Sequence, residues 1–341
     1  MTKPLVVVDA DVLGRRRTGD ETYVLNLLRA LAPLAPEAGL RIAAVTRHPE
    51  LVPEGIEPVE LSAPSQELRM LLTLPRLLRR LGAALGHFQY ALPLVLPCPA
   101  VVTIHDLSFE REPSLMSRRD RVIFRAFVPR AARTAKRVLT VSERTRHDLR
   151  ELYGISDDKI VVTPNGVDPA FTPGDGKGGY DYVLLVGVVQ ERKNPLAALV
   201  AAESAGLPLV VAGPAKDEAL ARELEHRGAR LAGYVEQDEL VQLYRGAACL
   251  IQPSRYEGFG LPVLEAMACG TPVVAVPEPA LQEVAGDAAV WAEEHELGDG
   301  IRRAVADRDR LVAAGLERAH LFSWPEAARR TLEVYREALG L

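Results

Sequence analysis

The sequence predicts an α/β protein of two doubly wound domains, each with a parallel sheet covered by helices on both faces. Its 341 residues exceed the size at which a single core keeps growing. Short apolar runs alternate with longer segments of helical periodicity, as expected for buried parallel strands joined by helices. The alternation is interrupted once by a glycine- and proline-rich passage, FTPGDGKGG (171–179), and then begins again.

The first series of elements occupies residues 1–170. A helix is expected from about Glu21, because a tyrosine and three leucines follow at helical spacing. Ser142 is expected to cap a later helix that ends on Gly154. The expected strands are LVVVD (5–9), RIAAVT (41–46), AVVTIHD (100–106), RVLTVS (137–142) and KIVVTPNGVD (159–168).

The second series occupies residues 171–324, and the tail, residues 325–341, is expected to form one amphipathic helix. Two doubly wound domains that face each other would bind a ligand at the carboxyl ends of their strands. The expected strands are YVLLVG (182–187), LPLVVAG (207–213), ARLAGYV (229–235), ACLIQPS (248–254), TPVVAV (271–276) and AAVW (288–291).

Composition narrows the class of protein. The hydrophobic and charged fractions, 48% and 26%, are those of an ordinary globular protein, and no apolar run is long enough to span a bilayer. A strand begins at once in MTKPLVVVDADV, so we expect no signal peptide and a cytoplasmic protein. The three cysteines are widely spaced and the seven histidines form no HxxxH pattern, so neither disulfides nor a zinc site is expected.

Charge is unevenly distributed along the chain. Residues 1–170 carry 24 lysines and arginines against 20 acidic residues, a net charge of +4, whereas the remainder has a net charge of −9. The whole-chain charge of −5 argues against a general nucleic-acid-binding protein.

The most informative stretch is SRYEGFGLPVLEAMACG (254–270), in which Glu257 and Glu265 flank two glycines and Pro262. Proline near the first position of a helix and glycines before it would let an anion approach unpaired N–H groups. Glu265 would lie in the opening turn of that helix and accept ribose hydroxyls, while Glu257 could reach a second polyol. A nucleotide sugar fits this pattern; a helix start with a surface glutamate fits it equally.

EGFGLPVLEAMACGTPVV resembles the donor-binding signature of the retaining glycosyltransferases of family 4, which have the GT-B fold. TIHDL, TVSERTRHDL, TPNGVD, VGVVQERKNP and EVAGDAA follow the family order. The resemblance implies two facing Rossmann-like domains with a C-terminal helix that crosses back to the first. It also implies that Glu257 contacts the donor sugar, that Glu265 holds the ribose, and that the backbone of 258–261 lies near sugar and phosphate. The donor-binding residues implied there are Gly258, Phe259, Gly260 and Leu261.

In VGVVQERKNP the expected strand ends at Gly187, and Arg192 and Lys193 follow in a loop. Two solvated cations before a helix are common, but the resemblance favours a clamp for the donor diphosphate. A fixed guanidinium and a point charge could then replace a metal ion. We therefore expect no cofactor and no metal.

His105 ends the strand in TIHDL, and a lone histidine there is often only structural. The family has a histidine at this place beside the donor sugar, which favours His105 as a sugar or acceptor contact. The first loop departs from the family pattern, since Arg15, Arg16 and Arg17 precede Gly19. Gly19 is our choice for close backbone approach to the donor.

Two rival functions remain. Asp9 and Asp11 mimic the metal-binding DxD motif of GT-A glycosyltransferases, but they follow the first strand of a chain with a second complete domain. A catalytically silent nucleotide-sugar-binding subunit is the other rival, and a transfer assay distinguishes it.

The resemblance implies a metal-independent hexosyltransferase that takes a nucleotide-diphosphate sugar and a hydroxyl acceptor. Mannose from GDP-mannose is the first choice of donor, and UDP-glucose is the second. The family mechanism is front-face, with the donor phosphate helping to deprotonate the acceptor.

Two basic stretches raise the question of a membrane surface. Residues 69–80 contain four arginines and no acid beside several leucines, and residues 118–137 contain seven arginines and Lys136 against Asp120. Basic amphipathic helices can lie on anionic lipid, so peripheral membrane contact is one expectation. The alternative is that the leucines are core residues and the arginines are solvated.

Overall fold

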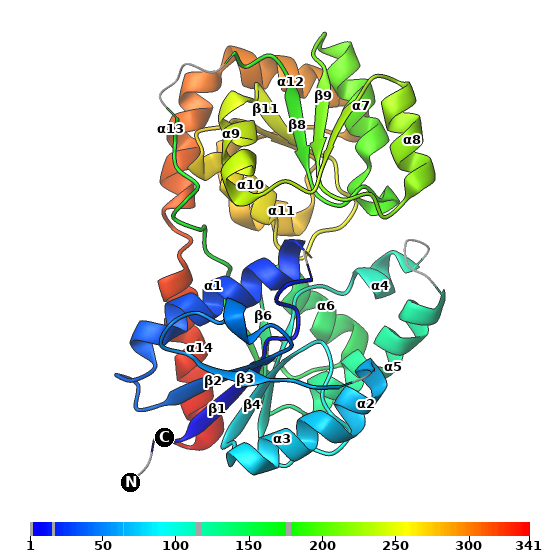
Figure 1. The fold of residues 1–341 in the computed structure, drawn as a ribbon. Helices are drawn as coiled ribbons and strands as arrows, with labels where there is room; N and C mark the ends of the chain where they lie inside the picture. Colours follow the sequence, from blue (N-terminus) through cyan, green and yellow to red (C-terminus); the bar gives the residue numbers. More distant parts are fainter. Residues whose placement is uncertain (1–2, 16–17, 64, 114–117, 175–178) are drawn as a thin grey trace. The chain divides into compact units, whose positions relative to one another are not determined.

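The computed structural model describes residues 3–15, 18–63, 65–113, 118–174 and 179–341 (Figure 1). The chain divides into two compact units, residues 1–166 with 324–341 and residues 167–323. We call these the N-terminal and C-terminal units. The border follows Gly166, whereas the sequence suggested residue 170, and residues 175–178 of the glycine-rich passage lie outside the described ranges.

The N-terminal unit contains a seven-stranded parallel sheet in the order β3-β2-β1-β4-β5-β6-β7. Its strands are β1 (Leu5–Asp9), β2 (Arg41–Thr46), β3 (Glu57–Glu60), β4 (Leu85–Gln89), β5 (Ala100–Ile104), β6 (Arg137–Thr140) and β7 (Ile160–Val162). Its helices are α1 (Thr18–Leu34), α2 (Gln66–Leu68), α3 (Leu74–Leu81), α4 (Ser108–Arg111), α5 (Arg118–Thr134), α6 (Glu143–Tyr153) and α14 (Trp324–Leu339). Shorter turns are η1 (Pro49–Leu51), η2 (Arg69–Thr73) and η4 (Asp157–Lys159).

The C-terminal unit contains a six-stranded parallel sheet in the order β10-β9-β8-β11-β12-β13. Its strands are β8 (Val183–Val186), β9 (Leu209–Ala212), β10 (Arg230–Gly233), β11 (Cys249–Gln252), β12 (Val273–Ala275) and β13 (Ala289–Trp291). Its helices are α7 (Pro195–Ser204), α8 (Glu218–His226), α9 (Gln237–Gly246), α10 (Leu261–Ala268), α11 (Pro279–Ala285), α12 (Leu297–Ala306) and α13 (Arg308–Ala319). Its shorter turns are η5 (Glu191–Lys193), η6 (Gly286–Ala288) and η7 (Glu294–Glu296).

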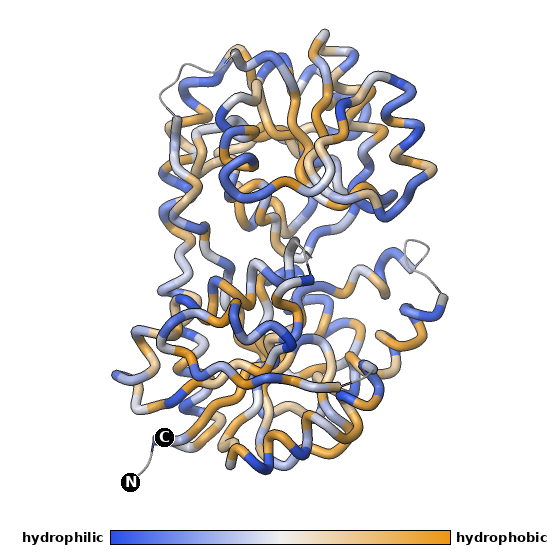
Figure 2. Tube along the Cα trace, in the orientation of Figure 1, coloured by the Kyte–Doolittle hydropathy of each residue, from blue (hydrophilic) through white to orange (hydrophobic). Residues whose placement is uncertain are grey.

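Each sheet is buried on both faces, which explains why its strands are apolar almost throughout. In β1, Leu5 and Val7 belong to one core together with residues of α3 and α5. Val6 and Val8, which point to the opposite face, are also fully buried. Figure 1 shows α14 lying alongside α1 on the N-terminal unit, and these two helices contact each other. Figure 2 shows hydrophobic residues concentrated on the strands.

Local signals explain where helices begin and end. The Ser142 hydroxyl accepts the N–H of Thr145 at 3.2 Å, and α6 ends at Gly154 with φ of 63°, as expected from its sequence. Helix α10 begins after Gly260, with Pro262 in its first turn. The helix expected from Glu21 begins at Thr18, and α14 begins at Trp324.

Two strands were missed from the sequence. β3 is an edge strand, and only Val59 of its four residues is buried, so its sequence lacks an apolar run. β4 is buried, but its sequence LGHFQ carries a histidine and a glycine and no β-branched residue. None of the described helices is both long enough and apolar enough to cross a lipid bilayer.

Candidate functional site

The site lies where the strand order of the C-terminal sheet reverses. β8 and β11 are neighbours, and from them the chain continues outward to β9 and β10 on one side and to β12 and β13 on the other. Loops that leave the carboxyl ends of two such strands diverge and leave room for a ligand. Arg192 and Lys193 follow β8, and Glu257 follows β11, so the topology brings these three predicted residues together.

The centre of the site is an ion pair. The Lys193 Nζ lies 2.6 Å from the Glu257 Oε1, and both side chains are about one-tenth exposed. Gln252, fully buried at the end of β11, donates its amide to the same Oε1 at 2.7 Å and to the Ser254 hydroxyl at 2.9 Å. Burial alone would raise the pKa of Glu257, but the Lys193 and Arg192 charges and hydrogen bonds from Lys193 and Ser254 outweigh it and lower the pKa to about 2. Glu257 is therefore an anion at neutral pH.

Arg192 is held beside this pair. Its Nη1 donates to the backbone oxygen of Tyr256 at 2.6 Å and lies 3.7 Å from the Glu257 Oε2. The backbone N–H of Arg255 donates to the Arg192 oxygen at 3.0 Å, which ties the two loops together. The Arg192 side chain keeps 18% of its surface exposed, so part of it remains accessible to a ligand.

Unusual backbone conformations shape the loop after β8. Gly187 has φ of 145°, and a Cβ added there would lie 3.3 Å from the Lys193 Cε. Gly213, at the end of β9, has φ of 150°, and its Cβ would lie 2.1 Å from the Gly187 oxygen. Asn194 adopts the left-handed conformation with φ of 51° between η5 and α7. Glycine at 187 and 213 thus permits the close approach that puts Lys193 in place.

The loop after β11 leads into α10 through the predicted glycines. Gly260 has φ of 111°, and a Cβ there would lie 2.7 Å from the Leu281 side chain, so no other residue fits without rearrangement. Gly258 is half-buried, as is Leu261, the first residue of α10. Phe259 is buried, and its ring packs edge-on against Phe322 at 5.9 Å between centroids. The Phe259 ring is therefore part of the core, and only its backbone can serve a ligand.

Glu265 lies elsewhere in α10 than its sequence suggested. It is the fifth residue of the helix and not part of the opening turn, because α10 already begins at Leu261. Its Oε2 accepts the hydroxyl of Tyr244, from α9, at 2.8 Å. Burial raises the pKa of Glu265 to about 7, since the hydrogen bond from Tyr244 offsets only part of it and the charge of Asp168 adds to it. This carboxylate is costly to ionise without further hydrogen-bond donors.

His105 lies just after β5 in the N-terminal unit, since the strand ends at Ile104. Its Nε2 donates to the Gln89 Oε1 at 2.8 Å, and the ring packs edge-on against Tyr23 at 4.6 Å. Burial lowers the pKa of His105, although Asp20 and Asp106 oppose the shift, so the ring is neutral at pH 7. Gly19 is exposed in the first turn of α1, with nothing within 4 Å of an added Cβ.

A buried polar chain connects the surroundings of His105 to α14. Tyr23 shares a hydrogen bond of 3.0 Å with Thr103, and Thr103 bonds to the Nε2 of His87 at 2.7 Å. The Nδ1 of His87 bonds to the Tyr335 hydroxyl at 2.6 Å. Burial lowers the pKa of His87 to about 3, so this chain is uncharged.

Asp9 and Asp11 are not arranged as metal ligands. Arg69, which is buried, forms an ion pair with Asp9, and its Nε lies 3.3 Å from Asp11. Arg15 and Arg47 also pair with Asp11. Three guanidinium groups neutralise the two carboxylates, which argues against the DxD reading. Arg69, in the π-helical turn η2, is buried against these aspartates and so is not part of a solvated basic face. Arg16 and Arg17 lie outside the described residues.

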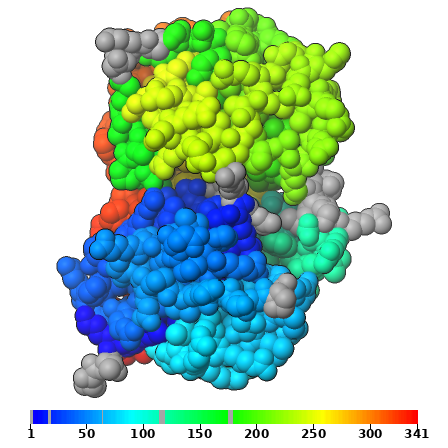
Figure 3. All heavy atoms as spheres, in the orientation of Figure 1, coloured from blue at the N-terminus to red at the C-terminus, as the bar shows by residue number. Residues whose placement is uncertain are grey.

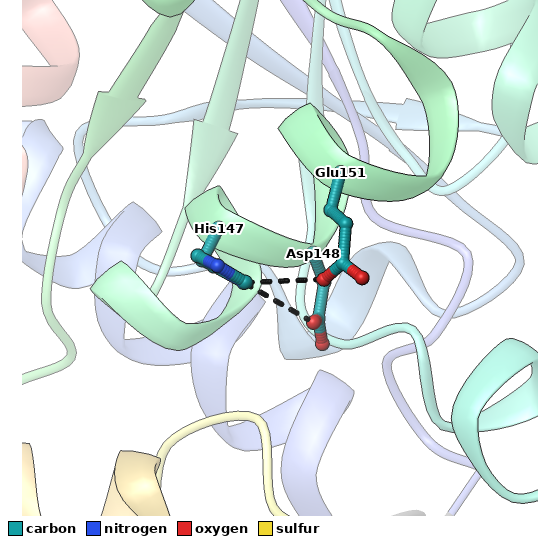
Figure 4. A group of neighbouring side chains, drawn as sticks. All are labelled: His147, Asp148 and Glu151. Carbon is teal, nitrogen blue, oxygen red and sulfur yellow. Dashed lines mark ion pairs between the residues drawn. The ribbon is translucent and has the colours of Figure 1, made fainter.

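Among the described residues, one group of side chains has the spacing of metal ligands: His147, Asp148 and Glu151 on α6 (Figure 4). Arg111 donates to Asp148 at 2.9 Å and also pairs with Glu151, and Arg144 lies 3.2 Å from Asp148. The hydrogen bond from Arg111 lowers the pKa of Glu151. These carboxylates are already neutralised by arginines, so the group is an ion-pair network centred on the buried Asp148.

Sequence reasoning missed four residues that contact or position the predicted residues of the two units. Gln89 and Gln252 are polar residues at the ends of buried strands, and that position could have identified them. Tyr244 and Gly213 gave no local signal, because their roles depend on contacts with distant residues.

Comparison with protein families gives two matches. Residues 17–171 match the family described as "Glycosyltransferase Family 4", and residues 172–318 match "Glycosyl transferases group 1". Together the matches cover both units.

Relatives include the O-antigen chain mannosyltransferase B of Escherichia coli, which is 31% identical over 268 residues, or 70% of each chain. A D-inositol 3-phosphate glycosyltransferase of Acidothermus cellulolyticus is 32% identical over 71% of this chain and 62% of its own length. The counterpart from Frankia alni is matched over 59% of its length, so the chain spans about three-fifths of these enzymes.

Solved structures share the fold at low sequence identity. Sucrose-phosphate synthase of Thermosynechococcus elongatus gives a TM-score of 0.79 at 21% identity over 99% of both chains. Anabaena HepE, solved with UDP and glucose, gives 0.73 at 14% identity over 98% of this chain and all of its own.

Proposed function

Because the chain belongs to glycosyltransferase family 4, with a C-terminal unit of the group 1 transferases, we propose that it is a retaining hexosyltransferase. It moves a hexose from a nucleotide-diphosphate sugar to a hydroxyl of a glycan, lipid-linked or small-molecule acceptor. The observation that carries this proposal is the pairing of Lys193 and Arg192 with Glu257 where the strand order of the C-terminal sheet reverses, between β8 and β11.

This arrangement suits a donor with a charged and a polyol part. The cations of Arg192 and Lys193 match a diphosphate, and the ionised Glu257 between them matches sugar hydroxyls. Glu265, whose carboxylate lacks enough donors to ionise readily, suits the hydroxyls of a ribose. The backbone of 258–261, held by the conformation of Gly260, lies where α10 begins and suits sugar or phosphate oxygens.

The chemistry needs little more than charge and position from these side chains. The acceptor oxygen bonds to the anomeric carbon while the bond from that carbon to the diphosphate breaks, and the hydroxyl proton passes to the leaving phosphate. Negative charge grows on the diphosphate as the bond breaks, and preformed cations stabilise it. We propose that Arg192 and Lys193 supply this charge without a metal, and that the neutral ring of His105 contacts the sugar or the acceptor.

The preferred donor is GDP-mannose, because the Escherichia coli relative is named a mannosyltransferase. UDP-glucose is the second choice, since HepE was also solved with UDP-glucose. The experiment that tests the function is a thermal-shift screen with GDP, UDP and their sugars, followed by a transfer assay with the donor that binds. A ligand at about 100 times its Kd stabilises a protein by about 2.7 kcal/mol. Binding without transfer to any acceptor or to water would indicate the silent subunit instead.

The N-terminal unit supports a peripheral membrane contact for a lipid-linked acceptor. Leu71 and Leu72 in η2 and Val122 and Ile123 in α5 are more than two-fifths exposed. The η2 leucines follow α2, whose Glu67 lies 4.0 Å from Arg119 of α5, so the two segments are close. Exposed arginines lie on α3, which follows η2, and on α5; they are Arg76, Arg79, Arg80, Arg119, Arg125 and Arg133. Figure 3 shows α3 and its neighbours on the outer surface of this unit.

An anionic lipid surface binds cationic side chains through its charge, and neighbouring apolar side chains can insert between the lipids. The leucines of residues 69–80 do not all face solvent, because Leu77 and Leu78 are buried in the core. Only Leu71 and Leu72 remain for such a contact, together with the exposed face of α5.

A further inference from the structure

Tyr244 is the residue whose role the proposed function leaves unexplained. Its hydroxyl donates to the Glu265 Oε2 at 2.8 Å, and its side chain is completely buried. Glu265 itself keeps 9% of its surface exposed. A ligand can therefore touch the glutamate but not the tyrosine, so Tyr244 can affect a ligand only through its neighbours, and Glu265 accepts its hydroxyl.

The tyrosine is itself rigidly held. The Thr271 hydroxyl donates to the Tyr244 backbone oxygen at 2.6 Å, and the Phe171 ring packs edge-on against the Tyr244 ring at 5.9 Å. The tyrosine comes from α9 and the glutamate from α10, so the hydrogen bond fixes the carboxylate relative to a second helix. A carboxylate oxygen that accepts from a fixed donor has fewer rotamers available, and its plane is set before a ligand arrives.

We propose that Tyr244 is a positioning residue, which holds the Glu265 carboxylate in the orientation that accepts the vicinal hydroxyls of a ribose. The inference rests on the proposed function, because it takes the ligand to be a ribonucleoside diphosphate. A purely structural role predicts something different: loss of the hydroxyl would weaken all ligands of the C-terminal unit alike, or none of them.

The experiment compares Tyr244→Phe with the wild-type protein by calorimetry, using GDP and UDP and their 2′,3′-dideoxy analogues. The nucleotide that binds the wild type more tightly is carried forward. A misoriented Glu265 would lose a hydrogen bond from the ribose, and such a bond to a charged group is worth roughly tenfold or more in an equilibrium constant. The Kd for the ribonucleotide should therefore rise about tenfold in the variant. The Kd for the 2′,3′-dideoxynucleotide should change by less than about twofold, because both hydroxyls that Glu265 would accept are missing.

Tyr182→Phe is the matched control. Tyr182 also uses its hydroxyl within this unit, but it donates to the Leu243 backbone oxygen at 2.7 Å and not to Glu265. Removal of the Tyr182 hydroxyl should affect the ribonucleotide and the 2′,3′-dideoxynucleotide equally. A double variant, Tyr244→Phe with Glu265→Gln, should bind no more weakly than Glu265→Gln alone.

Equal losses for both sugars, no loss for either, or additive losses in the double variant would each overturn the positioning role. The double-variant arm keeps the test valid if Tyr244→Phe alone is less stable. Failure of the wild type to bind any of the nucleotides would overturn the proposed function itself, which is a distinguishable result.

Discussion

Lys193 and Glu257 form a buried ion pair with 2.6 Å between Nζ and Oε1, although they lie 64 residues apart in the sequence. The pair links the loops that follow two neighbouring strands, and the Gln252 amide donates a hydrogen bond to the Glu257 Oε1. A diphosphate that approaches Lys193 must share this cation with the carboxylate. The site is therefore charged and preorganised without a ligand, which suits stabilisation of a charge that develops during the reaction.

The first prediction concerns the cations. Arg192→Ala and Lys193→Ala should each lower kcat by roughly 10²–10³, the scale for removal of one preorganised donor. Steady-state transfer assays measure this effect. Arg255→Ala is the matched control, because Arg255 is an exposed cation of the neighbouring loop that pairs with Glu191. Normal turnover in both variants, with the proteins folded, would contradict the proposal that Arg192 and Lys193 bind the diphosphate.

Lys193→Ala should also destabilise the C-terminal unit, since it removes the nearest cation from the buried Glu257 and leaves only Arg192, 3.7 Å away. Breaking a buried pair from one side costs about 3–5 kcal/mol. Adding Glu257→Gln to Lys193→Ala should recover much of that loss without restoring activity. Urea unfolding of the single and double variants measures the recovery, and equal stability of both would contradict the buried pair.

The third prediction separates the two glutamates. Glu265→Gln should weaken the binding of a bare nucleoside diphosphate by about 1.5–3 kcal/mol, since ribose hydroxyls lose a charged acceptor. Glu257→Gln should leave that binding intact or tighter, because Lys193 is no longer shared, while sugar transfer falls. Calorimetry with the diphosphate and with the intact donor distinguishes the two, and the reverse order would mean that their roles are exchanged.

The same glutamates should respond oppositely to pH. The folded pKa of Glu265, about 7, lies above its ordinary value, so its protonated form favours folding below about pH 4.5 and this benefit is lost as pH rises through 7. Glu265→Gln should therefore gain stability relative to the wild type between pH 5 and pH 8, on the order of 3 kcal/mol at most. Glu257, with its pKa lowered, contributes stability above about pH 4.5 that is lost only as pH falls toward 2. The cost of Glu257→Gln should be constant from pH 5 to 8, and urea titrations at both pH values provide the comparison.

The fifth prediction concerns metals. With Arg192 and Lys193 beside the proposed diphosphate, turnover should persist in excess EDTA. His147→Ala should behave like the wild type under the same treatment. Activity that disappears on chelation and returns with Mn²⁺ or Mg²⁺ would require a metal site that the ion-paired Asp9 and Asp11 do not suggest.

Membrane contact gives a prediction in cosedimentation. The protein should sediment with anionic vesicles at low salt and be released toward about 0.15 M salt, since screening weakens surface charge interactions. Replacing Leu71 and Leu72 by Gln should reduce binding at low salt. Val200→Gln, at an equally exposed apolar residue of α7, should not. A protein that stays in the supernatant at low salt would favour a soluble acceptor.

Much of the fold could be predicted from local sequence, because its signals are local. The buried parallel strands are recognisable as apolar runs. Ser142, Gly154 and Pro262 mark helix ends, and their effects extend over only a few residues. Strand β4 was not predicted, because the burial of its residues depends on tertiary contacts. The buried His87 bonds to Thr103 and to Tyr335, which is distant in the sequence.

The candidate site was harder to predict than the fold. The residue types and their order identified Glu257, Arg192 and Lys193 as candidates, but not that Lys193 and Glu257 pair. Arg69 looked like a member of a basic face, and only the π-helical turn and the two aspartates after β1 explain its burial. Such facts depend on tertiary contacts, which periodicity and spacing do not encode.

Helix α14 has a consequence for how the chain acquires its structure on the ribosome. The N-terminal unit joins residues 1–166 to residues 324–341, so it contains both the earliest and the latest of these segments to be synthesised. Until Tyr335 emerges, the Nδ1 of His87 lacks its native bond, and the sheet lacks one of its covering helices. Residues 167–323 form the other unit from one continuous stretch. The unit that begins synthesis second is therefore expected to complete its native structure first.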